Sequence, residues 1–301
     1  MATSRPTEQG ERQQQRAESL ASRFPPLLVA AERVAATVIQ GVHGRRRVGQ
    51  GETFWQFRRY EPGDSVDQID WRQSAKSDRV FVRETEWEAA QTVWLWRDVS
   101  PSMRYRSSKS LPEKSERADL LTMALAVLLV RGGEHVALLG SGHPPMTGRG
   151  AITRIVEIIC RPVTAEGAPS MPPEAPLPRY AQTVLIGDFF APLDEIAATV
   201  RGIAGRGVKG HLLQVMDPAE ETLPFTGRTR FEGLEREGDT LIPRVESVRG
   251  DYGQVLADHL AGLADIARAV GWKYLVHRTD RSPQTALLAL YMALADQRRW
   301  K

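Results

Sequence analysis

The sequence holds only one cysteine, Cys160, among its 301 residues. A single cysteine cannot form a disulfide within the chain, and it excludes zinc sites built from several thiolates. Any metal site in this protein must therefore rely on oxygen ligands.

Long hydrophobic runs are also missing. The longest, Leu120 to Val130, has 11 residues, whereas a membrane-spanning helix needs about 20. The first 20 residues are polar and lack the apolar segment of a signal peptide. We therefore expect no membrane span and a cytoplasmic location.

Neither sign of charge is in large excess. The 40 Lys and Arg residues against 37 Asp and Glu residues give a formal net charge of +3, which argues against a nucleic-acid partner for the chain as a whole. Arginines at positions 45–47 and 58–59, with Trp55 and Phe57 between them, form a local exception. Nucleic-acid binding through the arginine stretch 45–59 stays open as an alternative function.

The motifs of several enzyme classes are absent as well. The sequence contains no Gly-x-x-x-x-Gly-Lys-[Ser/Thr] nucleotide loop, no His-Glu-x-x-His pair and no Gly-x-Ser-x-Gly elbow. Its six histidines are scattered. The sequence therefore lacks the signatures of these enzyme classes.

From residue 91 onward, strand and helix patterns alternate. Short β-rich runs stand at 92–97, 135–139, 183–187, 212–216 and 274–277. Between these runs, apolar residues recur at helical spacing, and residues 116–131 are apolar almost all round. This alternation is typical of an α/β fold with a doubly wound, mainly parallel sheet. Residues 217–250 are rich in turn formers and indicate an excursion.

Composition divides the chain into three segments. Residues 1–24 form a polar tail, which we expect to be disordered or a frayed helix. Residues 25–90 are an aromatic N-terminal extension, which opens with a helix-like stretch and which we expect to pack on the main domain. Residues 91–301 form the main α/β domain.

Polar residues follow two of the predicted strands. Asp98, Ser100 and Ser102 form an Asp-x-Ser-x-Ser run after 92–97, and Asp188 directly follows 183–187. The carboxyl ends of parallel strands share one edge of a sheet, where function gathers. Carboxylates and hydroxyls are ligands for Mg²⁺ or Mn²⁺, although the same residues are ordinary in turns and helix caps. A metal-dependent hydrolase using these carboxylates stays open as a second alternative.

The run from Asp98 to Ser102 on this frame resembles the metal-ion-dependent adhesion site of von Willebrand factor A-type domains. The segments Arg59 to Asp64, Ile69 to Ala75, Asp217 to Glu221 and Gly227 to Phe231 look like one bacterial branch, the family called domain of unknown function 58. The resemblance covers roughly residues 41–300.

The resemblance implies a von Willebrand A-like fold and a non-enzymatic, metal-assisted role in protein binding. Asp98, Ser100 and Ser102 match the first loop of the metal site, and Asp188 matches the third. The second loop of the family supplies a threonine, for which Thr164 is the better candidate and Thr147 the other. The implied cofactor is Mg²⁺ or Mn²⁺, and a partner Asp or Glu would complete its coordination. The implied partner is a MoxR-type AAA+ ATPase.

Overall fold

A computed structural model of the protein describes residues 26–40, 54–60, 69–76, 79–85, 91–161, 168–234 and 238–296. These residues belong to two compact units. The larger unit contains the helix of residues 26–40 and the described residues from Gln91 onward, and the smaller unit lies within residues 42–90.

Five parallel strands form the sheet of the larger unit, in the order β4-β3-β5-β6-β9. Their bounds are Thr92–Arg97 (β3), His135–Leu138 (β4), Gln182–Gly187 (β5), Lys209–Met216 (β6) and Lys273–Arg278 (β9). β5 and β6 are buried along nearly their whole length, as expected of parallel strands covered on both faces. The five predicted strands and the α/β class with a parallel sheet are confirmed.

The chain reverses its direction across the sheet next to β3. This strand pairs with β4 on one side and with β5 on the other. The connection from β3 to β4 runs in one direction along the sheet, and the connection from β4 to β5 crosses to the other side of β3. In open α/β sheets such a switch point leaves a crevice at the carboxyl ends of the strands. The residues that follow β3 and β5 flank this crevice.

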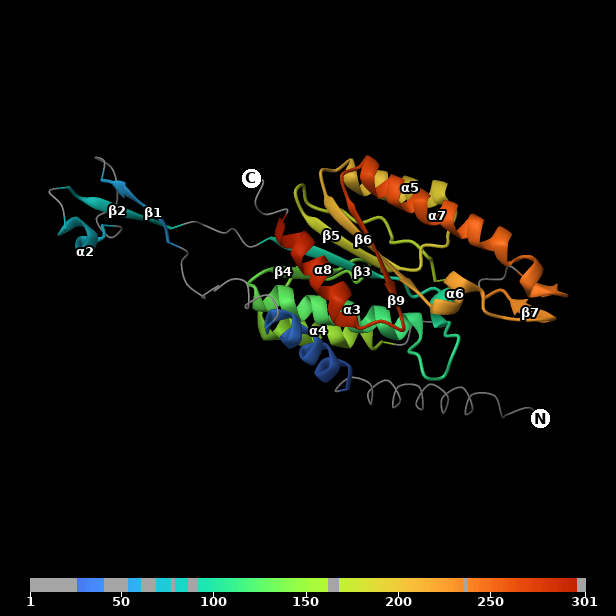
Figure 1. The fold of residues 1–301 in the computed structure, drawn as a ribbon. Coiled ribbons are helices and arrows are strands. Elements are labelled where there is room, and N and C mark those ends of the chain that lie inside the picture. Colours follow the sequence, from blue (N-terminus) through green and yellow to red (C-terminus); the bar gives the residue numbers. More distant parts are fainter. Residues whose placement is uncertain are drawn as a thin grey trace, which may run out of the picture. The chain divides into compact units, whose positions relative to one another are not determined.

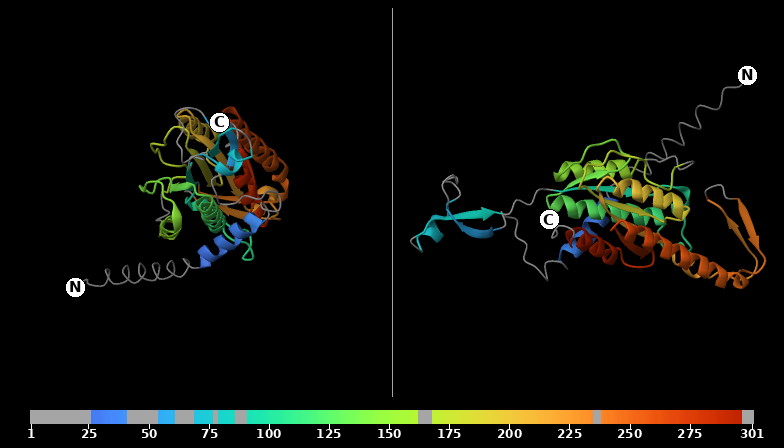
Figure 2. Two further views of the ribbon diagram at one scale, coloured as in Figure 1. Left: turned by 90° about the vertical axis from the view of Figure 1, so that its left-hand side faces the viewer. Right: turned by 90° about the horizontal axis from the view of Figure 1, so that it is seen from above.

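Helices cover both faces of the sheet (Figure 1, Figure 2). One face carries α3 (Lys114–Arg131), α4 (Gly148–Ile159), α8 (Pro283–Asp296) and the helix of residues 26–40, while the other carries α5 (Leu193–Ala204) and α7 (Arg249–Ala269). α3 is buried on most sides, as its nearly all-apolar sequence predicts. In the described segments, no helix combines the length and apolar character needed to cross a membrane.

The helix of residues 26–40 belongs to the unit that contains the sheet. Its buried face consists of Ala31, Val34, Ala35 and Val38, which recur at helical spacing. The carboxylate of Glu32 lies 3.6 Å from the guanidinium of Arg131 on α3. The sequence prediction had instead grouped this helix with the aromatic residues that follow it.

The smaller unit contains an antiparallel pair of strands, β1 (Phe54–Arg59) and β2 (Phe81–Thr85), and the short helix α2 (Trp71–Ser74). The Asp70 carboxylate caps α2 by accepting a hydrogen bond from the Gln73 amide at 2.8 Å. Packing of this segment on the main domain stays a prediction. The polar tail and Arg45 to Arg47 lie outside the described residues.

The turn-rich segment between β6 and α7 contains more structure than the sequence predicts. It holds α6 (Pro218–Thr222), the antiparallel hairpin of β7 (Thr229–Glu232) and β8 (Asp239–Ile242), and the 3-10 helix η3 (Val245–Ser247). The rings of Phe225 and Phe231 pack edge to face with centroids 5.6 Å apart. Strands of four residues are too short to show an alternating pattern, so the hairpin was not predicted.

A glycine lets Trp272 pack directly on β6. A Cβ atom at Gly210 would lie 2.4 Å from the Trp272 ring, and the indole N–H donates to the Val208 carbonyl oxygen at 3.2 Å. We expect Gly210→Ala to lower the free energy of unfolding by about 1–3 kcal/mol, because the added methyl overpacks this contact.

The matched control for this substitution is Gly253→Ala. Gly253 is exposed on α7, and a Cβ there meets nothing within 4 Å. This substitution should raise the free energy of unfolding by about 0.5–1 kcal/mol. Urea unfolding measures both, and equal effects of the two substitutions would contradict the packing argument.

Candidate functional site at the strand ends

Asp98 and Asp188 follow neighbouring strands and come to the same edge of the sheet. Both are buried, with 0% and 1% of their surface exposed. The Asp98 amide donates to the Ile186 carbonyl oxygen at 2.8 Å, which ties the end of β3 to β5. A Cβ at Gly187 would lie 2.9 Å from the Cβ of Asp98, so only glycine fits beside this carboxylate.

The loop after β3 is held by its own polar groups. The Ser100 amide donates to Oδ1 of Asp98 at 2.8 Å, and the hydroxyl oxygens of Ser100 and Ser102 lie 3.0 Å apart. The 3-10 helix η2 (Pro101–Arg104) starts directly after Ser100. One loop therefore gathers a carboxylate and two hydroxyls, which are suitable oxygen donors for a hard cation.

The ammonium group of Lys114 contacts the Asp188 carboxylate. The sequence did not predict this lysine as part of the site. Its Nζ atom is 2.9 Å from Oδ2 of Asp188 and 2.5 Å from Oε1 of Glu220. Only 1% of the Lys114 side chain is exposed. The rings of Tyr105 and Phe190 flank it, with centroids 5.9 Å and 5.2 Å from Nζ.

The charge balance keeps this lysine protonated. Burial lowers the pKa of Lys114, but the Asp188 and Glu220 carboxylates outweigh it, so the pKa is raised overall. For Glu220 burial prevails and raises the pKa, although Lys114 lowers it, and the charge of Asp188 also raises it. Two carboxylates around one ammonium leave the group of three with one net negative charge.

Glu220 is fixed by the start of α6. Its second oxygen accepts from the Asp217 amide at 2.8 Å. The Asp217 carboxylate accepts from the amides of Ala219 at 2.8 Å and Ser107 at 2.9 Å. The loop after β3 and the loop after β6 are thereby joined. Burial, followed by the charges of Asp217 and Glu220, raises the pKa of Tyr105 to about 12.

These loops form one surface, which we call the strand-end rim and define as residues 98–113, 188–190 and 217–221. Of the three acidic residues in the last segment, Asp217 and Glu220 line the rim, and Glu221 pairs with Arg278 at 2.9 Å.

The position of Lys114 carries one signal that can be recognised in the sequence. It begins a helix, where the macrodipole disfavours a cation, so a nearby carboxylate is expected.

Of the two candidate threonines, Thr147 is the one among the described residues, and it does not lie at the rim. Thr164 lies outside them. Thr147 follows Met146, whose backbone pairs with Val136 near the start of β4. Val136 is level with Val93 on β3, five residues before Asp98, so Thr147 lies near the opposite edge, about 15 Å away at the rise of a strand.

The residues around Asp188 fit an ammonium group and leave this carboxylate unsuited to a second cation. Asp98, Ser100 and Ser102 carry oxygen atoms of the kind that a hard cation binds, and all three come from the loop after β3. Within the described ranges, no three His, Cys, Asp or Glu side chains are grouped so that they could hold a metal ion. Of the expected metal ligands, Asp98, Ser100, Ser102 and Asp188 follow β3 and β5 at one edge of the sheet, and Thr164 lies outside the described residues.

Two side chains, those of Gln214 and Arg117, position the elements beneath the rim. Gln214 on β6 donates to the Asp188 carbonyl oxygen at 2.7 Å and accepts a hydrogen bond from the Tyr274 hydroxyl. The Arg117 guanidinium, one turn after Lys114 on α3, donates to the carbonyl oxygens of Thr279 and Arg281 at 2.9 Å and 2.7 Å. These contacts hold the start of α3 at the edge of the sheet.

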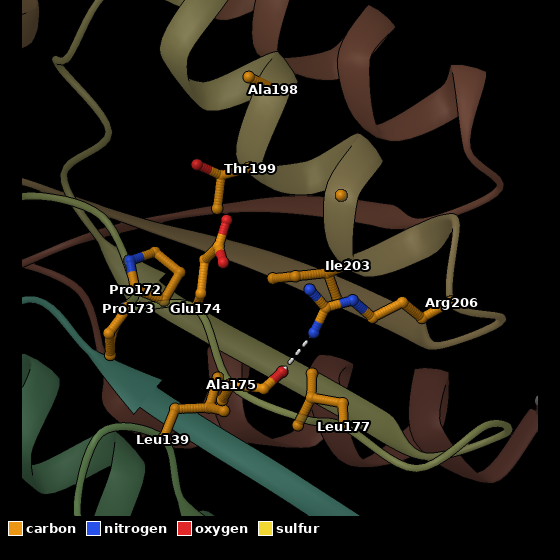
Figure 3. A pocket seen from close by; sticks show the side chains of 11 residues that line it. Leu139, Pro172, Pro173, Glu174, Ala175, Leu177, Ala198, Thr199, Ile203 and Arg206 are labelled. Atoms are coloured by element: carbon orange, nitrogen blue, oxygen red, sulfur yellow. Dashed lines mark hydrogen bonds between the residues drawn. The ribbon is translucent and has the colours of Figure 1, made fainter.

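A cavity of about 210 Å³ lies between α5 and the loop of residues 168–180 (Figure 3). Its lining includes Leu139, Leu177 and Ile203, and Arg206 donates to the Ala175 carbonyl oxygen at 2.6 Å beside it. Asp98, Ser100, Ser102 and Asp188 are not among its lining residues. The cavity is therefore separate from the candidate site.

Comparison with known proteins identifies the family. The family model described as Protein of unknown function DUF58 matches residues 56–262. The chain belongs to the DUF58 family. Its relatives include the uncharacterized proteins Mb1516 of Mycobacterium bovis and Rv1480 of Mycobacterium tuberculosis. Each is 27% identical over 257 residues, which cover 81% of this chain and 80% of the relative.

Two solved structures are similar to this DUF58 chain at lower levels. They are an aerotolerance-related membrane protein from Bacteroides fragilis and the conserved hypothetical protein BatB from Bacteroides thetaiotaomicron. Both cover 69% of this chain and 100% of the solved chain, with TM-scores of 0.41 and identities of 19% and 18%.

Removing the ammonium should destabilise the rim. Lys114→Met leaves Asp188 and Glu220 buried without their shared cation, so we expect the free energy of unfolding to fall by about 3–5 kcal/mol. The control is Lys109→Met, because Lys109 is exposed on the same loop and should change stability by less than about 0.5 kcal/mol. Equal losses in urea unfolding would show that the buried ion pair is not the cause.

The fold should also weaken as the pH falls. Burial, followed by the charge of Arg117, lowers the pKa of His277 from 6.5 to about 4, and Arg117 lies 3.1 Å from its Nε2 atom. The unfolded chain therefore binds the proton first, and the stability present above pH 6.5 is lost progressively toward pH 4.

The matched variant for this effect is His277→Gln, which keeps an acceptor for Arg117 but does not titrate. Between pH 7 and pH 5, the original protein should lose about 2 kcal/mol more than the variant in urea unfolding. His211, whose pKa burial also lowers to about 4, contributes equally to both proteins. Identical pH profiles would refute the role of His277.

Proposed function

We propose that the chain is a protein-binding module of the von Willebrand factor A type, that it has no enzymatic activity, and that it binds its partner through the strand-end rim. The proposal is supported by the parallel sheet with its switch point between β3 and β5. It is also supported by the Asp-x-Ser-x-Ser loop, which lies at that point.

The observation that carries the proposal is the contrast between the buried and exposed charges of the rim. Within the rim, Asp98, Asp188 and Asp217 are buried. Above them, the segment 101–113 exposes Arg104, Arg106 and Lys109. The segment is anchored in its middle, where the Ser107 amide donates to the Asp217 carboxylate, and at its C-terminal end, where the Lys114 amide donates to the Tyr105 carbonyl oxygen at 3.1 Å. An anchored, positively charged loop suits an acidic protein surface.

The rim is poorly suited to catalysis. Asp98 and Asp188 are almost fully buried, whereas a general base must reach the proton that it abstracts. The histidine beside Phe190 is His259, and its Nε2 atom lies 2.7 Å from the Phe189 carbonyl oxygen. These contacts favour a binding surface over the hydrolase alternative.

The proposed partner is a MoxR-type AAA+ ATPase. This step rests on the resemblance to von Willebrand factor A-like members of the domain of unknown function 58. The resemblance also implies a metal-assisted form of the binding, with Mg²⁺ or Mn²⁺ on Asp98, Ser100 and Ser102. The contacts of Lys114 argue against that form. Calorimetry with either metal decides it: metal binding that Asp98→Ala abolishes would support the metal-assisted form, and no binding by the unchanged protein would contradict it.

The rim can be tested by removing its exposed charges. We expect Arg104→Ala with Arg106→Ala to weaken binding to a MoxR-type ATPase from the same cell by about tenfold, and to reduce the salt dependence of binding, because the loop loses two cations. Biolayer interferometry at low and high salt measures both effects.

The control combines Arg149→Ala with Arg201→Ala. These arginines are exposed on α4 and α5, outside the rim, and their loss should leave the affinity unchanged. If both double variants bind equally well, the rim is not the binding surface. If the unchanged protein does not bind the ATPase, the proposed partner is wrong.

A further inference from the structure

We infer that the ammonium group of Lys114 is the resident cation of the strand-end rim and that it occupies Asp188, one of the residues that the resemblance gives to a divalent metal. The rim would then be preorganised without any added ion. The consequence for partner binding rests on the proposed function, whereas the inference about the cation concerns this chain alone.

The first support is the position of the ammonium group. It joins the residue after β5, through Asp188 at 2.9 Å, to the segment after β6, through Glu220 at 2.5 Å. Lys114 itself ends the connection from β3 to α3. A single side chain therefore links the three connections that form the rim, as a bound cation would.

The second support is the chemistry of the surroundings. An ammonium group has three N–H donors, and two of the directions around Nζ lead to the carboxylates. Tyr105 and Phe190 present ring atoms at cation–π distance. Mg²⁺ demands about six oxygen ligands and usually keeps several waters, so aromatic walls suit it poorly.

The third support is that the ammonium group already occupies one oxygen of Asp188, at 2.9 Å from its Oδ2 atom. A divalent ion on Asp98, Ser100 and Ser102 would share Asp188 with a buried positive charge that cannot move into solvent. Repulsion between like charges grows as the surroundings become drier. The fixed ammonium and a divalent metal therefore compete for one carboxylate.

The experiment measures metal binding by the chain alone, using Mn²⁺ and Mg²⁺ in calorimetry and thermal unfolding. We expect no binding by the unchanged protein at millimolar metal. Lys114→Ala removes the resident cation and leaves both carboxylates, so it should gain a Mn²⁺ site. Its melting temperature should rise by about 5 °C or more when metal exceeds the dissociation constant 100-fold.

A second variant covers the case in which Lys114→Ala does not fold. Lys114→Ala with Glu220→Gln removes one charge of each sign, so the group keeps its net charge of one negative while Asp98, Ser100, Ser102 and Asp188 remain. It should also gain Mn²⁺ binding, and adding Asp188→Asn should abolish that gain. Lys109→Ala serves as the control and should bind no metal.

Two results would overturn the inference. One is metal binding by the unchanged protein that Asp98→Ala abolishes, because the site would then hold a metal beside the lysine. The other is a folded lysine variant that gains no metal binding, because the ammonium would then fill no cation position. Failure of the ATPase to bind would affect only the proposed function, since this experiment contains no partner.

Discussion

The structure of the rim depends on one ammonium group shared by two buried carboxylates. Asp188, Glu220 and Lys114 come from three different connections of the sheet, and taking any one of these charges out of water is costly unless the others accompany it. The backbone supports the arrangement, because Asp217 holds Glu220 at the start of α6 and Gln214 holds the carbonyl of Asp188. Charge pairing therefore helps to fix the relative positions of these three connections, together with apolar packing.

Local sequence patterns were sufficient to predict the sheet. Each strand is a short apolar run, and the helices between them repeat at 3.6 residues, so both can be recognised within a window of a few residues. The placement of Asp98 and Asp188 at one edge also followed, since it needs only the rule that parallel strands end on the same side. The hairpin of β7 and β8 and the assignment of the helix of residues 26–40 to the larger unit did not follow, because they depend on contacts distant in sequence.

The partners of Lys114 could not be predicted for the same reason. Asp188 lies 74 residues away and Glu220 lies 106 residues away. The place of Lys114 at a helix start suggests that a carboxylate lies nearby, but nothing in the neighbouring sequence identifies which one. The Asp-x-Ser-x-Ser run was enough to place Asp98 at the carboxyl edge of the sheet. It suggested a metal because such a motif describes only the ligands and gives no information about a distant side chain beside them.

The burial of Lys114 has a consequence for its chemical reactivity. An amine attacks acylating reagents only when it is unprotonated and accessible, and this one is held protonated by two carboxylates and enclosed beneath the rim. Lys109, exposed on the same loop, has no such protection. Acylation of Lys114 would thus require the three connections to separate, so that a modified Lys114 marks a rim that has opened.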